Sequence, residues 1–121
     1  MQHKIHPMFI KSFHQLTKKN VAEAGGKGAS LGEMTNAKIP VPPGCVVLAE
    51  AFDKFLIETD LAQELEAILK KINYKDINSV DGASAVIRNL ILKAAMPKDL
   101  ETGITKEFKK LKAKFVAVRS S

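Results

Sequence analysis

Tryptophan is absent from this sequence of 121 residues, and tyrosine and cysteine each occur once. The single cysteine, Cys45, excludes an internal disulfide framework and a cysteine-rich zinc site, and it is typical of a reducing compartment. No uninterrupted apolar run comes close to the ~20 residues that cross a bilayer, and residues 1–7 lack the apolar segment of a signal peptide. We therefore expect a cytoplasmic protein without a membrane span, folded as one domain over residues 1–121.

Positive charge is in excess, with 19 Lys and Arg against 13 Asp and Glu and a formal net charge of +6. The lysines are spread along the chain and gather only near its end, at Lys106, Lys109, Lys110, Lys112 and Lys114. Aromatic residues do not alternate with them, as they do on surfaces that stack nucleic-acid bases. We therefore expect a solvated lysine face and no nucleic-acid partner, and the charge suits a small polyphosphate such as ATP.

Apolar patterning predicts an α+β (α/β-like) fold, with a small β-sheet flanked by about five helices. Short apolar runs predict strands at residues 8–13, 45–48 and 115–118. Helical spacing of apolar residues predicts helices at residues 29–34, 50–57, 61–72, 79–94 and 97–111. For the fourth helix Ser79 or Asp81 is the expected cap, and Pro97 suits the first turn of the fifth.

The strongest local signal is the run Gly25-Gly26-Lys27-Gly28, which leads into a helix. Glycines let a ligand approach the backbone closely, and a helix N-terminus favours an anion. Lys27 adds a mobile positive charge that could reach a phosphate oxygen. The spacing is neither that of a Walker A loop nor that of a dinucleotide-binding fingerprint. A phosphate site and a purely structural turn both remain open at this point.

Arg119 is the second candidate, because it emerges at the end of the expected strand beside Ser120 and Ser121. A rigid guanidinium flanked by hydroxyl groups can grip a phosphate, although a charged residue that simply closes a strand is the alternative. The sequence also stops directly on this strand pattern, whereas domains usually finish with an exposed tail. We therefore expect it to be a piece of a longer protein.

Other chemistry-bearing residues give weaker signals. His3 and His6 lie near the N-terminus and His14 lies alone, without a cysteine or carboxylate at ligand spacing, so no metal site is predicted. Cys45 is interpreted as a small buried apolar residue rather than a nucleophile. Glu33 follows the glycines and could neighbour phosphate or magnesium, although a solvated helix face is the simpler interpretation.

Three motifs occur in a distinctive order: GGKGASLGEM at residues 25–34, IPVPPG at 39–44 and VAVRSS at 116–121. Together they closely resemble the N-terminal part of the phosphoenolpyruvate synthase (pyruvate, water dikinase) and pyruvate phosphate dikinase family. The resemblance covers the chain from about Phe9. It implies the first subdomain of an ATP-grasp nucleotide-binding domain.

The resemblance also implies roles for individual residues. Lys27 and Arg119 would contact ATP phosphates, with Gly25, Gly26, Gly28 and Ser120 beside them. The parent enzyme would pass phosphate from ATP to a histidine on another domain and then to pyruvate, forming phosphoenolpyruvate, AMP and phosphate with magnesium as cofactor. The magnesium ligands, the second ATP-grasp subdomain, the phosphohistidine domain and the pyruvate-binding barrel would lie beyond Ser121. We therefore expect no catalytic residue here and no activity from this chain alone.

Several alternatives share the same ATP-binding module. Rifampicin phosphotransferase, pyruvate phosphate dikinase and the glucan-water dikinases differ mainly in their other domains. The Val-Arg-Ser-Ser motif suits the synthase and rifampicin phosphotransferase better than the dikinase, and the Met34 to Gly44 stretch most resembles the synthase. A stand-alone regulatory or nucleotide-binding module belongs to a different class, and the gene sequence beyond Ser121 would separate the two. Loss of the second subdomain would uncover apolar surface, which leaves self-association of the chain open.

Two positions depart from the family pattern. Relatives commonly carry glycine where Lys38 lies, at the end of the first helix, and an aromatic residue where Cys45 begins its strand. A lysine in a left-handed helix cap would cost about 1 kcal/mol. Both departures concern packing, and neither removes a proposed phosphate contact.

Overall fold

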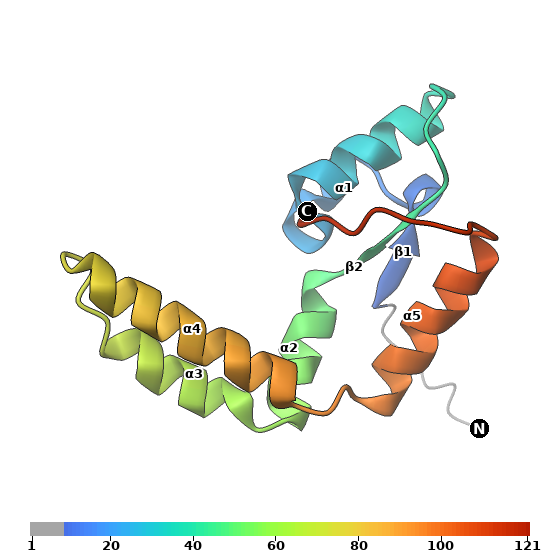
Figure 1. The fold of residues 1–121 in the computed structure, drawn as a ribbon. Coiled ribbons are helices and arrows are strands. Elements are labelled where there is room, and N and C mark those ends of the chain that lie inside the picture. Colours follow the sequence, from blue (N-terminus) through green and yellow to red (C-terminus); the bar gives the residue numbers. More distant parts are fainter. Residues whose placement is uncertain (1–8) are drawn as a thin grey trace, which may run out of the picture. The chain divides into compact units, whose positions relative to one another are not determined.

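The computed structural model describes residues 9–121, which form a two-stranded sheet, two 3-10 turns and five α-helices (Figure 1). In chain order these are β1 (Ile10–Ser12), η1 (Phe13–Gln15), η2 (Lys18–Asn20), α1 (Val21–Asn36), β2 (Cys45–Val47), α2 (Ala49–Glu58), α3 (Leu61–Lys70), α4 (Ile77–Lys93) and α5 (Lys98–Lys110). The expected α+β class and the number of helices are confirmed. The chain forms two compact units: the first comprises the residues up to Phe52 together with Lys98–Ser121, and the second comprises Asp53–Pro97.

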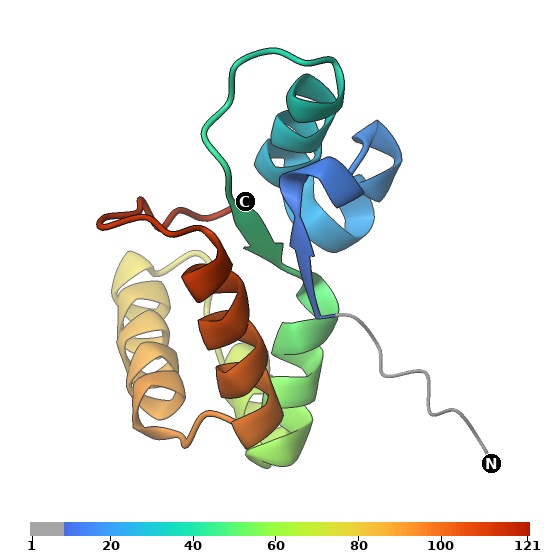
Figure 2. The ribbon, with the colours of Figure 1, turned by 90° about the vertical axis from the view of Figure 1, so that its right-hand side faces the viewer.

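The sheet of the first unit pairs β1 with β2 in antiparallel register, with Lys11 opposite Val46 (Figure 2). Val46 is buried on the core side of the sheet. The backbone N–H of Leu48 extends the pairing by donating to the carbonyl oxygen of Phe9 at 2.8 Å. The strands predicted near residues 8–13 and 45–48 are thereby confirmed, except that Met8 lies outside the described residues.

The strand predicted at residues 115–118 is wrong. No described strand pairs with this run, which follows an irregular path after α5. Its side chains are also largely uncovered, since Phe115 is 84% and Val118 93% exposed. A β-branched, apolar run becomes a strand only where a neighbouring strand accepts its backbone hydrogen bonds.

Leu16 is the centre of the first unit's core and is fully buried. It packs with Ala24, Val46 and Leu48, and Phe13 covers the cluster from the side. The chain on either side of Leu16 forms the 3-10 turns η1 and η2. The carbonyl oxygen of Leu16 accepts a hydrogen bond from the side chain of Asn36 on α1 at 2.8 Å, a contact across 20 residues of the chain.

Helix α1 is longer than the predicted helix at residues 29–34 and ends in a Schellman motif. The N–H of Ile39 donates to the carbonyl oxygen of Met34, and the N–H of Lys38 donates to that of Thr35, both at 3.0 Å. Lys38 has φ of 61°, in the left-handed region. The left-handed cap considered from the sequence is therefore present, and Lys38 occupies it.

The second unit contains the antiparallel pair α3 and α4. Asp76 caps α4, since its carboxylate accepts the N–H of Asn78 at 3.0 Å. The expectation that Ser79 or Asp81 would cap this helix is wrong, because α4 begins earlier. The Ser79 hydroxyl instead accepts the N–H of Asn73 and closes the turn that precedes the helix. No helix of residues 9–121 is long and apolar enough to cross a membrane.

Candidate functional site

Gly25 breaks α1 into two helical pieces within the glycine-rich motif. Its φ of 77° and ψ of 169° are not helical, so one turn of helix ends at Ala24 and a new helical segment begins at Gly26. Any other residue would be strained at this φ. The sequence did not predict this kink. It did predict a helix N-terminus in the glycine run, and the kink creates one at Gly26 to Gly28.

The last residue of the sequence, Ser121, lies against this kink (Figure 1). Its hydroxyl oxygen accepts the N–H of Gly28 at 2.8 Å and donates to the carbonyl oxygen of Ala24. A Cβ atom on Gly25 would lie 2.5 Å from the carbonyl carbon of Ser121, so this approach requires glycine. The structure thus brings together the two motifs that the sequence had singled out separately, Gly25 to Gly28 and Arg119 to Ser121.

The glycines of the motif have different surroundings. A Cβ atom on Gly28 would lie 2.9 Å from the Ser121 hydroxyl and 3.0 Å from Val46, so close packing explains Gly28. A Cβ atom on Gly26 would meet nothing within 4 Å. Contacts within the described chain explain Gly25 and Gly28, whereas the backbone at Gly26 is open to a molecule from outside.

Two cationic residues are close in the chain to the residues that meet at the kink. Lys27 and Arg119 are exposed, as is Ser120. Within residues 9–121 neither cation takes part in any ion pair or hydrogen bond that the structure shows. Lys27 immediately precedes Gly28, and Arg119 lies two residues, or at most ~7 Å of chain, before Ser121. Both charges are therefore free to meet an anion.

Glu33 has a partner in the fold. Its carboxylate accepts the backbone N–H of Lys18 at 2.9 Å and so holds η2 against α1. The interpretation of Glu33 as part of a solvated helix face did not include this contact, because no sequence pattern links Lys18 with Glu33, 15 residues later. Residues 9–121 contain no group of three or more His, Cys, Asp or Glu side chains able to hold a metal ion, and His3 and His6 lie outside this range.

Cys45 is half-buried at the start of β2. Burial raises the pKa of its thiol, and the negative charge of Glu107 on α5 raises it further. A raised pKa keeps the thiol protonated at neutral pH, and a thiol is a far weaker nucleophile than a thiolate. This environment agrees with the interpretation of Cys45 as a packing residue.

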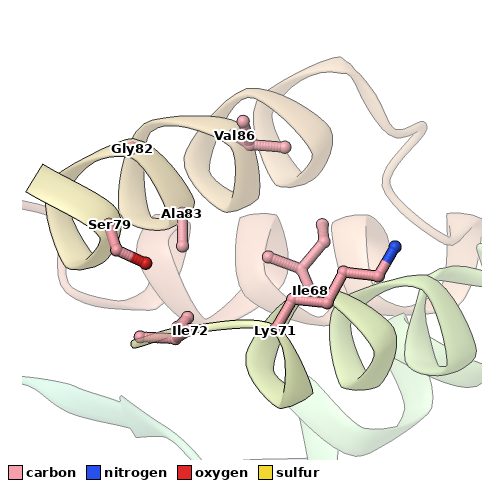
Figure 3. Close-up of a pocket in the computed structure, with 7 residues that line it drawn as sticks. All are labelled: Ile68, Lys71, Ile72, Ser79, Gly82, Ala83 and Val86. Atoms are coloured by element: carbon pink, nitrogen blue, oxygen red, sulfur yellow. The ribbon is translucent and has the colours of Figure 1, made fainter. Parts of the chain in front are cut away.

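A pocket lies in the second unit, between α3 and α4. Apolar side chains from the two helices face each other across it, and its volume is about 240 Å³ (Figure 3). Its lining consists of Ile68, Lys71, Ile72, Ser79, Gly82, Ala83 and Val86. None of the candidate residues from the sequence lies here, and the lining offers one charged group only.

Comparison with known proteins identifies the family. The pyruvate phosphate dikinase AMP/ATP-binding domain matches residues 21–121, a range that includes both the glycine kink and Ser121. The chain belongs to this family. The resemblance drawn from the three motifs is thereby confirmed.

Several archaeal proteins similar to this chain are named phosphoenolpyruvate synthase or probable phosphoenolpyruvate synthase. A probable phosphoenolpyruvate synthase of Methanocaldococcus jannaschii is 46% identical over 103 residues, covering 85% of this chain and 9% of that protein. One from Methanothermobacter thermautotrophicus is 38% identical over 119 residues, covering 93% and 17%. The phosphoenolpyruvate synthase of Pyrococcus furiosus is 50% identical over 74 residues, covering 60% and 9%. The chain therefore spans less than a fifth of the length of each of these three relatives.

Proposed function

We propose that this chain binds the phosphate groups of ATP at the Gly25 kink, as part of a phosphoenolpyruvate synthase-type enzyme of the cytoplasm. One observation carries the proposal. The Ser121 hydroxyl bonds to both sides of the kink, which brings the chain segment that carries Arg119 to the segment that carries Lys27 and supports a single site for both. Membership of an AMP/ATP-binding domain family supports the nucleotide as the ligand.

The groups at the site suit a polyphosphate. The helical segment that begins at Gly26 directs its N–H groups and the positive end of its dipole toward the kink. Lys27 supplies a mobile point charge and Arg119 a planar fork that can bind two phosphate oxygens. The Ser120 hydroxyl adds a donor, and the open backbone at Gly26 allows close approach. The net charge of +6 draws the anion in.

In the whole enzyme we propose the reaction that the relatives' name indicates. ATP, pyruvate and water would give phosphoenolpyruvate, AMP and phosphate by way of a phosphohistidine. This chain would form one wall of an ATP-grasp cleft, as its first subdomain, and would hold and orient the phosphates. Magnesium would neutralise phosphate charge, but we assign none of its ligands to this chain. The second subdomain, the phosphohistidine domain and the pyruvate-binding barrel are the proposed partners.

The direct test is an amide NMR titration of the 121-residue chain with Mg-ATP. We expect chemical-shift changes confined to residues 25–28 and 119–121. Lys27→Ala and Arg119→Ala should each weaken binding by about 10-fold to 150-fold, since a hydrogen bond to a charged group contributes about 1.5–3 kcal/mol. Lys75→Ala, which removes an exposed lysine from the second unit, is the matched control. Equal weakening by Lys75→Ala would mean that ATP is held by net charge rather than by this site.

Gly26→Ala distinguishes an effect on Mg-ATP binding from an effect on stability, because the two are expected to change in opposite directions. A Cβ atom at this position meets nothing within 4 Å, so alanine should stabilise the chain by about 0.4–1 kcal/mol. If ATP approaches the backbone here, the same methyl group should weaken Mg-ATP binding. A variant that is more stable and binds ATP as tightly as the wild-type chain would place the ligand elsewhere.

A further inference from the structure

The helical segment that begins after Gly25 lacks a cap of its own. Helices usually begin after Ser, Thr, Asp or Asn, whose side-chain oxygen accepts the N–H of the second or third helical residue. Gly25 holds the cap position here and has no side chain. Counting from Gly26 as the first helical residue, Gly28 is the third, and its N–H is the group that such a cap would satisfy.

Ser121 supplies the missing contact from 93 residues away. Its hydroxyl oxygen accepts the Gly28 N–H at 2.8 Å. The same hydroxyl donates its proton to the carbonyl oxygen of Ala24, the last residue before the kink. One oxygen atom therefore bonds to groups on both sides of Gly25 and replaces the helical hydrogen bonding that the kink interrupts.

This hydroxyl also makes the hydrogen bonds that tie residues 115–121 to the rest of the chain. In the described structure, residues 115–121 make no hydrogen bonds to the rest of the chain except these two. The run is not in a strand, and Val118 is 93% exposed. The position of Arg119, two residues before the contact, depends on it.

We propose that Ser121 is a positioning residue that caps the kinked helix α1 and thereby holds Arg119 beside Lys27 for phosphate binding. The proposal rests on the proposed function, because it assigns the ATP phosphates to these two cations. Ser121 itself need not touch the nucleotide. Its effect on binding acts through Arg119 and through the shape of the Gly25 turn.

The contact itself is tested without nucleotide, by amide hydrogen exchange of Gly28. Ser121→Ala removes both hydrogen bonds, and we expect Gly28 to exchange roughly fivefold faster, as for the loss of about 1 kcal/mol. Ser121→Thr keeps the hydroxyl and should restore protection. Ser84→Ala on α4, in the second unit, is the control. Unchanged exchange at Gly28 in Ser121→Ala would overturn the proposal whatever happens to ATP binding.

Positioning is tested by Mg-ATP titration of the same variants. We expect Ser121→Ala to raise the dissociation constant roughly fivefold, with Ser121→Thr close to the wild-type chain. In an Arg119→Ala background, Ser121→Ala should change the dissociation constant for Mg-ATP by less than about twofold, because the guanidinium that Ser121 positions is absent.

The outcomes separate this proposal from the proposed function. Absence of any wild-type response to Mg-ATP would refute phosphate binding by this chain, and the positioning role with it. Wild-type binding that is unchanged in Ser121→Ala would refute positioning alone and leave the ATP site standing. Equal effects of Ser121→Ala with and without Arg119 would show a contact that stabilises the turn but does not place the guanidinium.

Discussion

Gly32 on α1 lies so close to Leu16 that a Cβ atom on Gly32 would be 2.5 Å from the Cβ atom of Leu16. Leu16 is fully buried at the centre of the first unit's core and has no room to move away. We therefore expect Gly32→Ala to lower the free energy of unfolding by about 1–3 kcal/mol, the usual range for overpacking a core. Urea unfolding followed by circular dichroism measures the change.

Gly26→Ala is the matched control for this substitution. It makes the same chemical change on the same helix, but the added methyl group meets no atom within 4 Å. It should raise the free energy of unfolding by about 0.4–1 kcal/mol, because alanine has less backbone freedom to lose on folding. If both variants shifted stability in the same direction, contact with Leu16 would not be the reason for glycine at position 32.

The left-handed cap at the end of α1 predicts a stabilising substitution. Lys38 has φ of 61° and donates its N–H within the Schellman motif. Glycine adopts this conformation without the steric penalty that a side chain brings, so Lys38→Gly should raise the free energy of unfolding by about 1 kcal/mol. Thermal or urea unfolding of the two chains provides the measurement.

Two variants separate backbone strain from charge at this cap. Lys38→Gln removes the positive charge and keeps the strained φ, so it should give little or none of the gain. Ala37→Gly places glycine one residue earlier, at φ of −79°, where alanine is not strained. There, the greater backbone freedom of glycine in the unfolded chain should lower the free energy of unfolding. Stabilisation by Lys38→Gln equal to that of Lys38→Gly would point to charge instead.

Local patterns in the sequence were sufficient for the parts of the fold that depend on local physics. The apolar stripe of residues 61–72 predicted α3 because it repeats with helical spacing. The apolar run after Gly44 predicted β2 because turn residues bound it. The glycine pattern indicated a helix N-terminus near Lys27, and the structure shows one at Gly26.

Features that depend on distant partners could not be predicted in this way. Residues 115–118 have strand-forming side chains, but no described strand is available to pair with them. Ser121 looked like a neighbour of Arg119 and carries the contact to Gly28 only because the fold brings its hydroxyl there. Gly32 lay within the predicted helix at residues 29–34 without an assigned reason, and the structure explains it by the close packing of Leu16.

The ion pair between Lys11 on β1 and Glu23 on α1 predicts a pH-dependent contribution to stability. The Lys11 amine lies 3.0 Å from the Glu23 carboxylate and lowers the pKa of Glu23 below its ordinary value of 4.5, opposed by desolvation of the carboxylate. A lowered folded-state pKa stabilises the fold above the unfolded value, and this stabilisation is lost as pH falls through the folded value. Wild-type chain and Glu23→Gln should differ in stability at pH 7 and converge as the pH falls below the lowered pKa of Glu23.

Lys11→Met gives the check on this interpretation. In that background the amine that lowers the pKa of Glu23 is absent, so Glu23→Gln should produce a smaller pH-dependent difference in unfolding free energy. The hydrogen bond from Asn20 to Glu23 remains in both backgrounds. An undiminished difference would assign the effect to Asn20 rather than to Lys11.

The raised pKa of Cys45 predicts slow reaction with alkylating reagents. Burial and the nearby charge of Glu107 both disfavour the thiolate, so iodoacetamide should modify Cys45 more slowly at pH 8 in the folded chain than in urea. Glu107→Gln removes the charge, lowers the pKa and should speed the reaction about twofold, since the interaction is partly screened by water. Glu101→Gln, at an exposed position of the same helix, is the matched control. Equal acceleration by both variants would mean that loosening of α5, rather than the charge of Glu107, controls the reactivity of the thiol.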